Sequence, residues 1–442
     1  MFYKILSLFI LLLLSCIRSY PLRAANNVEN NIMHAELSNG LNIYVIPNHR
    51  TQAVFHAIIY KVGGMDDPIG KTGLAHYFEH LMFEITGKFK NIESTMSSIG
   101  AQFNAFTTRE YTCYYELVLK DDLSLVMDAE ADRMRDFNVA QDKAEREKNI
   151  VLEERKMRFD NNPHNLLLEE MNSVFYHTGY GRSVIGWESD IKTYNQDDIV
   201  RFHDNYYHPG NSILLIVGDV EFDEVMKLIE KKYGKIKARP TIRHYPNQNP
   251  VHDVDVSVTL KNAEIKEPVL YFRYRVPLFK NINEIYAVNL AVEALGSGKS
   301  SKLYRDLVLN RNVAVSVSAY YDSLTFSDGY IDIEVIPKSG IKLDIVEKEL
   351  DDSIKNFIFE GVNDEELQRA KFKCKATHFD TLSDLTNIAM FYIPRLALDV
   401  PLDEIDISYS KINSVNLESV NDKIRTIFSA NRLVGRLLPI RR

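Results

Sequence analysis

The stretch His76-Tyr77-Phe78-Glu79-His80, preceded by Thr72-Gly73-Leu74-Ala75, determines how the rest of the chain is interpreted. Successive residues of a helix turn by about 100°, so His76 and His80 lie roughly 40° apart and Glu79 lies within roughly 100° of both. Two imidazoles and one carboxylate therefore face the same side. Two neutral imidazoles can bind zinc, and a carboxylate beside them can take a proton from water at the metal. The stretch predicts a metal site with His76 and His80 as ligands and Glu79 as general base.

A catalytic zinc normally has three protein ligands and an open fourth position, so a third ligand is needed from elsewhere in the chain. Residues 145–155 (EREKNIVLEER) contain strong helix formers and neither glycine nor proline. Within this segment Glu147 and Glu154 are seven residues apart and share a helix face, whereas Glu153 points about 100° away from Glu154. The alternative interpretation of the bare motif is an accidental pair of histidines on a solvated helix face, and a third ligand argues against it.

These two segments together resemble the pitrilysin-type zinc metallopeptidases, or inverzincins, in which H-x-x-E-H is followed some seventy-odd residues later by an E-x-x-x-x-x-x-E helix. Here Glu154 follows His80 by 74 residues. The resemblance implies one zinc ion per chain, bound by His76, His80 and Glu154, with Glu79 as the catalytic base. It further implies that Glu147 is an outer partner that orients a ligand. Among members of this family, the chain is most similar to the short, processing-peptidase-like bacterial proteins.

A second segment also resembles this family. Residues 100–108 (GAQFNAFTT) are similar to its active-site strand, and the similarity extends over roughly residues 35 to 435. The resemblance implies that Asn104, Ala105 and Phe106 line a cleft in which an extended peptide substrate adds to an exposed strand edge. The alternative is an ordinary alternating strand with Asn104 at a bend.

The order of strands and helices predicts an α+β fold. Residues 235–253 contain Pro240, Pro246 and Pro250 without apolar periodicity, which is typical of a linker, and the order of elements recurs after them. We expect two homologous α/β-sandwich lobes from an internal duplication, each a mixed or antiparallel sheet with helices. The boundaries are 26–236 for the metal-binding catalytic lobe, 237–252 for the linker and 253–442 for a lobe without H-x-x-E-H. The main predicted strands are 41–46, 53–60, 112–119, 212–217, 269–276, 314–320 and 330–336, and the main predicted helices are 92–99, 123–137, 145–158, 197–206, 284–295, 301–309, 343–359 and 364–375.

The first 25 residues are typical of a signal peptide. Lys4 precedes an apolar run, Ile5–Leu14, that is shorter than the roughly 20 residues of a membrane span. We expect export, to a bacterial periplasm. Leu13-Leu14-Ser15-Cys16 faintly resembles a lipoprotein box, so a lipid anchor on Cys16 is an alternative, but we favour removal of Cys16 with the signal peptide.

Composition excludes other classes of partner. The chain has 442 residues, of which 45% are hydrophobic and 26% charged, and its net charge of −8 offers no basic surface for nucleic acid. Residues 296–300 (GSGKS) look like a phosphate loop, but Glu293 stands where the pattern requires glycine, so no nucleotide site is expected. Cys113 and Cys374 are interpreted as two isolated buried thiols, a disulfide between them being the alternative.

One departure from the family pattern concerns partners. Self-sufficient members carry an arginine and a tyrosine seven residues apart in the second lobe, where they contact substrate or oxyanion. Val308 and Val315 occupy these positions here, and neither side chain can donate a hydrogen bond. We therefore expect a zinc endopeptidase that hydrolyses extended peptides with a zinc-activated water, in a hetero-oligomer with a related subunit that lacks zinc ligands. A homodimer is the alternative assembly, and a non-catalytic structural or assembly subunit is the alternative function.

Overall fold

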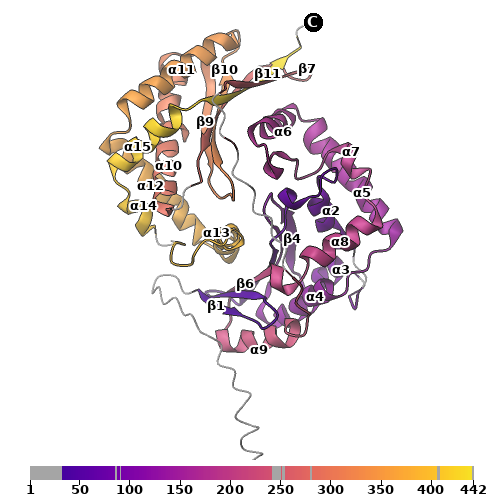
Figure 1. Ribbon diagram of the computed structural model, residues 1–442. Helices are drawn as coiled ribbons and strands as arrows, with labels where there is room; N and C mark the ends of the chain where they lie inside the picture. The colour runs from indigo at the N-terminus through magenta and orange to yellow at the C-terminus, as the bar shows by residue number, and fades with distance from the viewer. Residues whose placement is uncertain are drawn as a thin grey trace, which may run out of the picture.

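The computed structural model describes residues 32–84, 87–89, 91–240, 250, 254–278, 281–405 and 409–440. They form two lobes that face each other (Figure 1). The predicted signal peptide and most of the predicted linker lie outside the described residues. In the part of the chain that is described, no helix is both long and apolar enough to cross a membrane.

The first lobe is built on a six-stranded sheet with the order β1-β2-β6-β3-β5-β4. Its strands are β1 (Met33–Glu36), β2 (Asn42–Pro47), β3 (Ala53–Tyr60), β4 (Gln102–Thr107), β5 (Thr112–Leu119) and β6 (Ser212–Gly218). Its helices are α2 (Leu74–Leu81), α3 (Ile92–Ser98), α4 (Leu123–Arg135), α5 (Gln141–Arg155), α6 (Pro163–Phe175), α7 (Glu188–Ile191), α8 (Gln196–Tyr206) and α9 (Phe222–Tyr233). β4 lies at one edge of this sheet, and among the described strands it pairs with β5 alone.

The second lobe is built on a five-stranded sheet with the order β7-β11-β8-β10-β9. Its strands are β7 (Val256–Asn262), β8 (Val269–Val276), β9 (Ala314–Asp322), β10 (Gly329–Pro337) and β11 (Arg432–Pro439). Its helices are α10 (Ile282–Gly296), the π-helix η6 (Tyr304–Asn310), α11 (Leu343–Glu360), α12 (Asp364–Thr381), α13 (Leu385–Ala397), α14 (Ser410–Ser414) and α15 (Leu417–Phe428).

The two sheets have the same topology. β2 pairs in parallel with β6, and β7 pairs in parallel with β11 in the same way. In each sheet the remaining three strands continue antiparallel, in the order β6-β3-β5-β4 in the first and β11-β8-β10-β9 in the second. The five strands also follow each other along the chain in the same order, and β1 is an addition to the first sheet. The predicted α+β class and the predicted repetition of one unit are therefore confirmed.

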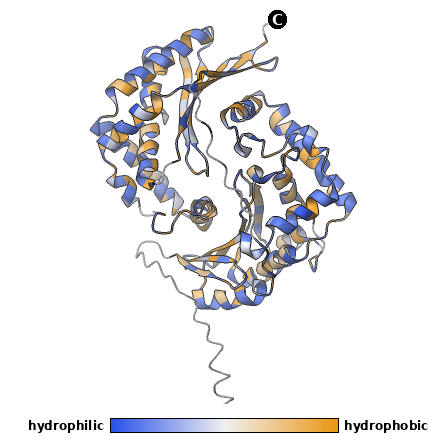
Figure 2. Cartoon of the chain, viewed as in Figure 1, coloured by the Kyte–Doolittle hydropathy of each residue, from blue (hydrophilic) through white to orange (hydrophobic). Residues whose placement is uncertain are grey.

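The lobes exchange one helix each. α6, from the first half of the chain, packs on β11 and β7 of the second sheet, and α13, from the second half, packs on β6 and β3 of the first. Ile388 and Ile393 of α13 share a buried core with Phe55 and Cys113 of the first sheet. The strands and α13 carry many apolar residues (Figure 2). Because each helix buries apolar surface against the other lobe, the lobes are held together by more than the chain that connects them.

Three predicted helices differ from the structure by more than two residues at an end or in the type of helix. α5 begins at Gln141 because residues 141–144 are helix-compatible and contain no breaker, and it ends at Arg155, where the π-helix η3 (Lys156–Asp160) follows. The segment predicted as a helix over 301–309 contains the π-helix η6. α12 continues to Thr381, beyond the predicted end at residue 375.

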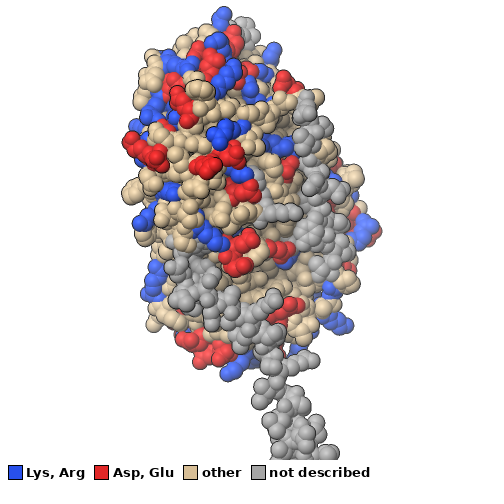
Figure 3. All heavy atoms as spheres, turned by 60° about the vertical axis from the view of Figure 1, so that its left-hand side comes forward, with Lys and Arg blue, Asp and Glu red and all other residues tan. Residues whose placement is uncertain are grey.

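Two further features of the described residues concern cysteine and charge. Cys113 is buried and Cys374 is half-buried, and both are free thiols. The alternative of a disulfide between them is therefore excluded. The predicted burial is confirmed for Cys113, whereas Cys374 is only partly buried. The face in Figure 3 carries basic and acidic side chains close together, so the described residues of this face form no extended region of one sign.

Candidate metal centre

The start of α2 is fixed by a buried carboxylate. Asp67 accepts hydrogen bonds from the backbone N–H groups of Gly73, at 2.7 Å, and Ala75, at 2.8 Å. These N–H groups at the start of a helix have no partner within it, so the Asp67 side chain supplies the acceptors that the helix itself lacks. Gly73 has φ 85°, and a Cβ at this position would lie 2.5 Å from the Cα of Gly186. Only glycine suits both this conformation and this close approach.

α5 is anchored at both ends, to α2 near its start and to α6 and Gly186 at its last residue. The Tyr77 hydroxyl of α2 donates to the carbonyl oxygen of Ala144 at 2.6 Å. At the other end Arg155 binds both carboxylate oxygens of Glu169 on α6, each at 3.0 Å, and donates to the carbonyl oxygen of Gly186 at 2.7 Å. A buried bidentate pair of this kind fixes orientation as well as distance. The preceding residue, Glu154, is thereby held facing α2.

The structure brings His76, His80 and Glu154 together. Glu154 Oε2 lies 3.5 Å from His76 Nε2 and 3.4 Å from His80 Nε2, and the three ligand atoms all lie within 4.8 Å of one another. This Oε2 is buried and makes no hydrogen bond within the described residues. Atoms bound to one tetrahedral ion at about 2.0–2.2 Å are separated by about 3.3–3.6 Å. The two distances from Glu154 Oε2 to the imidazole nitrogens therefore fit a cation of the size of zinc.

The protonation states suit a cation. Burial lowers the pKa of His76 to about 4, so this imidazole is neutral at pH 7. Burial raises the pKa of Glu154, but His80 and His76 outweigh this effect and lower the pKa overall, which leaves the carboxylate charged. For His80, burial lowers the pKa, but the nearby carboxylates of Glu154 and Glu79 raise it by more, so the pKa of His80 is raised overall. Metal binding would then compete with a proton on His80 alone.

Glu147 and Glu153 are clearly distinguished. Glu147 Oε2 lies 3.4 Å from His80 Nδ1, the nitrogen that faces away from Glu154, and its side chain is 9% exposed. Such a contact orients an imidazole and selects which ring nitrogen carries the proton. The Glu153 side chain is 77% exposed and forms an ion pair with Lys156, at 3.8 Å. The structure therefore brings Glu154 against both imidazoles and Glu147 against His80 alone, and it leaves Glu153 outside this group.

Glu79 lies on the same face of α2 and lines the same cleft as the three donors. Burial raises the pKa of this carboxyl, and a hydrogen bond from the Thr107 hydroxyl, at 2.6 Å to Oε2, opposes the rise. Within the described residues no other hydrogen bond reaches this carboxylate. A buried carboxylate with a raised pKa is suited to accept and return a proton near neutral pH.

The cleft has a volume of about 690 Å³ and contains the donors, Glu79 and most of β4. Asn104 is exposed on this edge strand, and its Oδ1 accepts from the backbone N–H of Ala105 at 2.8 Å. Phe106 borders the cleft, but its ring packs with Tyr111 on the opposite side of the sheet, at 5.9 Å between ring centroids. The remaining lining residues are Phe83, Glu84, Glu93, Phe103, Thr107, Arg146, Glu147, Ile150 and Arg158.

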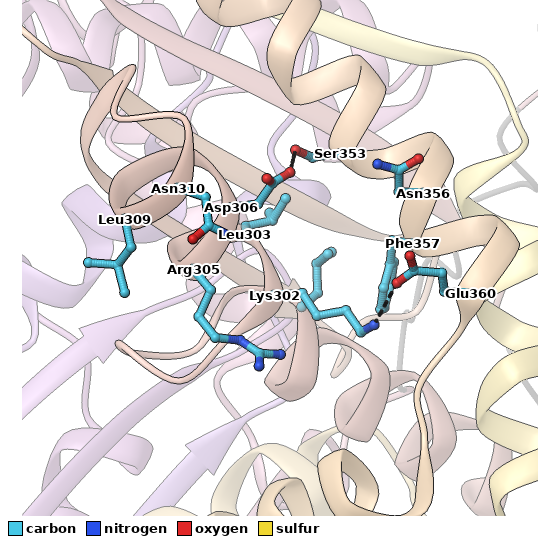
Figure 4. A pocket seen from close by; sticks show the side chains of 11 residues that line it. Lys302, Leu303, Arg305, Asp306, Leu309, Asn310, Ser353, Asn356, Phe357 and Glu360 are labelled. Atoms are coloured by element: carbon cyan, nitrogen blue, oxygen red, sulfur yellow. Dashed lines mark hydrogen bonds and ion pairs between the residues drawn. The ribbon is translucent and has the colours of Figure 1, made fainter.

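A second hollow of about 530 Å³ lies in the second lobe (Figure 4). Its charged side chains are already paired, Lys302 with Glu360 at 3.3 Å and Arg305 with Glu366 at 2.9 Å. Its lining residues are Leu295, Lys302, Leu303, Arg305, Asp306, Leu309, Asn310, Ser353, Asn356, Phe357 and Glu360. Asp306, which also lines the hollow, pairs with Arg311 at 2.9 Å, so each charged lining residue has a partner among the described residues.

Sequence reasoning did not identify Asp67, Arg155 or Thr107. Asp67 had a local signal, because an acidic residue shortly before a predicted helix is a common capping group. Arg155 and Thr107 had none, since their partners lie 14 and 28 residues away on other elements.

Comparison with known proteins identifies the class. The model named Insulinase (Peptidase family M16) matches residues 43–187, and the model named Peptidase M16 inactive domain matches residues 193–374. The chain belongs to peptidase family M16, the insulinase and pitrilysin-type peptidases, as the resemblance of its motifs predicts. The model described as inactive covers the part of the chain that follows the metal centre.

Individual relatives agree with this assignment. Zinc protease PqqE of Helicobacter pylori is 28% identical over 363 residues, which cover 80% of each protein. The crystal structure of a protease from Helicobacter pylori matches with a TM-score of 0.84 at 24% identity, over 92% of this chain and 99% of that one. The periplasmic protease PqqL of Escherichia coli matches with a TM-score of 0.78 at 16% identity, over 92% of this chain but only 47% of that one.

Proposed function

We propose that this protein is a zinc-dependent endopeptidase in which His76, His80 and Glu154 hold one zinc ion. The observation that carries the proposal is the convergence of three donor atoms, two of them 3.4 and 3.5 Å from a buried carboxylate oxygen that has no hydrogen-bond partner within the described residues. Membership of a family whose relatives include zinc proteases supports the reaction class.

Glu79 is the general base in this proposal. Zinc, when bound, acts as a Lewis acid that makes water a better nucleophile and polarises a carbonyl group. The Glu79 carboxylate removes a proton from the attacking water and returns it to the departing amine. Burial favours this role, since the raised pKa brings the proton affinity of Glu79 closer to neutral pH.

The substrate is an extended peptide that adds to β4. This strand is an edge, so its outward backbone groups are available for pairing with another strand. The side-chain oxygen of Asn104 accepts the hydrogen bond of the Ala105 backbone N–H, and a carbonyl oxygen of the bound peptide would accept this hydrogen bond instead. The contribution of Phe106 is through its backbone, because its ring packs on the other side of the sheet.

We also propose that catalysis requires a related subunit that lacks zinc ligands. Val315 is 54% exposed on β9, and Val308 packs against the core of the second lobe. Arg311 pairs with Asp306 at 2.9 Å and also with Glu349, so it is not free to replace an arginine at position 308. PqqL matches this chain over only 47% of its own length, so a chain of that length has room for a second unit of this size, which is compatible with the proposed pairing.

The export signal supports a periplasmic location, which we propose on the sequence of residues 1–25.

Glu79→Gln provides the main functional test. The zinc-loaded mature chain and the variant are compared for zinc content and for cleavage of a quenched peptide library. Cleavage that the variant loses while it retains zinc supports the peptidase.

The remaining outcomes separate the two proposals. Cleavage by the isolated wild-type chain would exclude the need for a partner. Cleavage only after adding a related subunit would support the proposed partner, and cleavage only in the homodimer fraction would replace that partner by a second copy of this chain. Zinc binding without cleavage in any assembly would favour a non-catalytic assembly subunit. Near-normal activity of the zinc-loaded variant would exclude Glu79 as the base.

A further inference from the structure

We propose that Thr107 is the positioning residue for Glu79. Its hydroxyl holds Glu79 Oε2 against β4 and leaves Oε1 as the oxygen that exchanges the proton. The inference rests on the proposed function, because it assigns a task within the same site.

The contact joins two elements that the fold brings together. Thr107 is the last residue of β4, where it pairs with Thr112 of β5, and Glu79 lies on α2. The Thr107 Oγ1 to Glu79 Oε2 distance is 2.6 Å, which is within the range of strong hydrogen bonds from a hydroxyl to a carboxylate. A strand within a sheet is a rigid support, so the hydroxyl is well placed to fix a side chain on a neighbouring helix.

The neighbouring contacts determine the direction of this hydrogen bond. The Thr112 hydroxyl donates to the carbonyl oxygen of Val62 at 3.0 Å, and that bond uses its only proton. Thr107 Oγ1 and Thr112 Oγ1 are 3.4 Å apart, a longer and weaker contact. An ionised carboxylate can only accept. Thr107 therefore donates its proton to Glu79, and its oxygen remains an acceptor toward Thr112.

Glu79 depends on this contact for its orientation. Within the described residues the Thr107 hydroxyl is the sole hydrogen-bond partner of the Glu79 carboxylate, and none reaches Oε1. The last torsion of a glutamate side chain is broad and roughly two-fold, so burial alone does not select one carboxylate orientation. With Oε2 held on the strand, the free Oε1 is the oxygen available on the cleft side.

The test compares Thr107→Val, which keeps the shape of the side chain and removes the donor, with Thr107→Ser, which keeps the donor. We expect Thr107→Val to lower kcat by about 10- to 100-fold, the usual effect of losing a hydrogen bond to a charged group. KM should change by less than about twofold because the backbone of β4 is intact, and Thr107→Ser should retain most of kcat. A general loss of folding would instead lower kcat in both variants and would reduce the zinc content.

Crystal structures of the three zinc-free proteins give a readout that is independent of activity. We expect the Glu79 carboxylate to keep its orientation in the wild type and in Thr107→Ser, and to rotate or become mobile in Thr107→Val. Unchanged kcat together with an unchanged Glu79 in Thr107→Val would overturn the proposal. If the wild-type chain cleaves no peptide in any assembly, the proposed function fails, and the crystal structures still decide whether Thr107 positions Glu79.

Discussion

Glu147→Gln is the most informative single change near the metal centre. It keeps the size of the side chain and removes the negative charge that lies 3.4 Å from His80 Nδ1. The Nε2 atom of the same ring is the one that faces Glu154. Glu147 is therefore expected to act on the metal only by fixing the tautomer, orientation and basicity of His80.

The expected loss of zinc affinity can be set from the geometry. Partners of this kind typically contribute a factor of about 10–100 to metal affinity. The contact of 3.4 Å is longer than the 2.7–2.9 Å of strong charge-assisted bonds, and Arg146 shares the carboxylate at 3.3 Å, so the lower end of the range applies. We expect zinc to bind about tenfold more weakly, which corresponds to about 1.4 kcal/mol.

The assay is a competition titration of zinc between the protein and a chromophoric chelator at pH 7. Glu153→Gln is the matched control, since it removes a charge from the same helix at a side chain that is 77% exposed and does not contact the site. We expect the control to bind zinc like the wild type. Equal affinity in all three proteins, or a larger loss in Glu153→Gln than in Glu147→Gln, would refute the reasoning.

Three further predictions follow from other contacts. Asp67→Ala removes two hydrogen bonds to the start of α2 and should lower the free energy of unfolding by about 2 kcal/mol, measured by denaturant titration; an unchanged midpoint would show that the cap is dispensable. His56 is buried with its pKa lowered to about 4, so its stabilising contribution is present above the unfolded pKa of about 6.5 and is lost as the pH falls toward 4. In the zinc-free protein His56 should therefore account for a loss of about 2 kcal/mol between pH 7 and pH 5, and His56→Gln should lose that much less than the wild type; parallel pH profiles would contradict this. Replacing Val308 by Arg and Val315 by Tyr together should give the isolated chain peptide-cleaving activity if a partner normally supplies these groups, and no gain in kcat/KM would count against that explanation.

The residues of the metal centre differ in how far the sequence alone could predict their positions. His76, Glu79 and His80 lie within one helical turn, so their common face follows from helix geometry alone. Glu154 belongs to another helix, and only the family pattern selected it over Glu153. Because Glu147 lies on the same helix face as Glu154, a contact between Glu147 and the metal site could be expected from the sequence. The distance between Glu147 and His80 could not be predicted.

Parts of the fold were beyond sequence reasoning for a physical reason. The strands Ala53–Tyr60 and Ser212–Gly218 are largely apolar runs at the centre of a sheet, and runs of this kind can be predicted as buried strands from the sequence alone. The helices Pro163–Phe175 and Leu385–Ala397 were not predicted, and each buries its apolar face against the sheet of the opposite lobe. That partner surface is assembled from strands far away in the sequence. Phe106 illustrates the same limit, because its side of the strand depends on what each face of the sheet packs against.

The most direct test of the central claim is anomalous diffraction at the zinc edge from crystals of the zinc-loaded chain. We predict one peak per chain at about 2.0–2.2 Å from His76 Nε2, His80 Nε2 and a carboxylate oxygen of Glu154. A peak coordinated by Glu147 or Glu153 instead of Glu154, or no peak between α2 and α5 in a protein shown to contain zinc, would contradict the account.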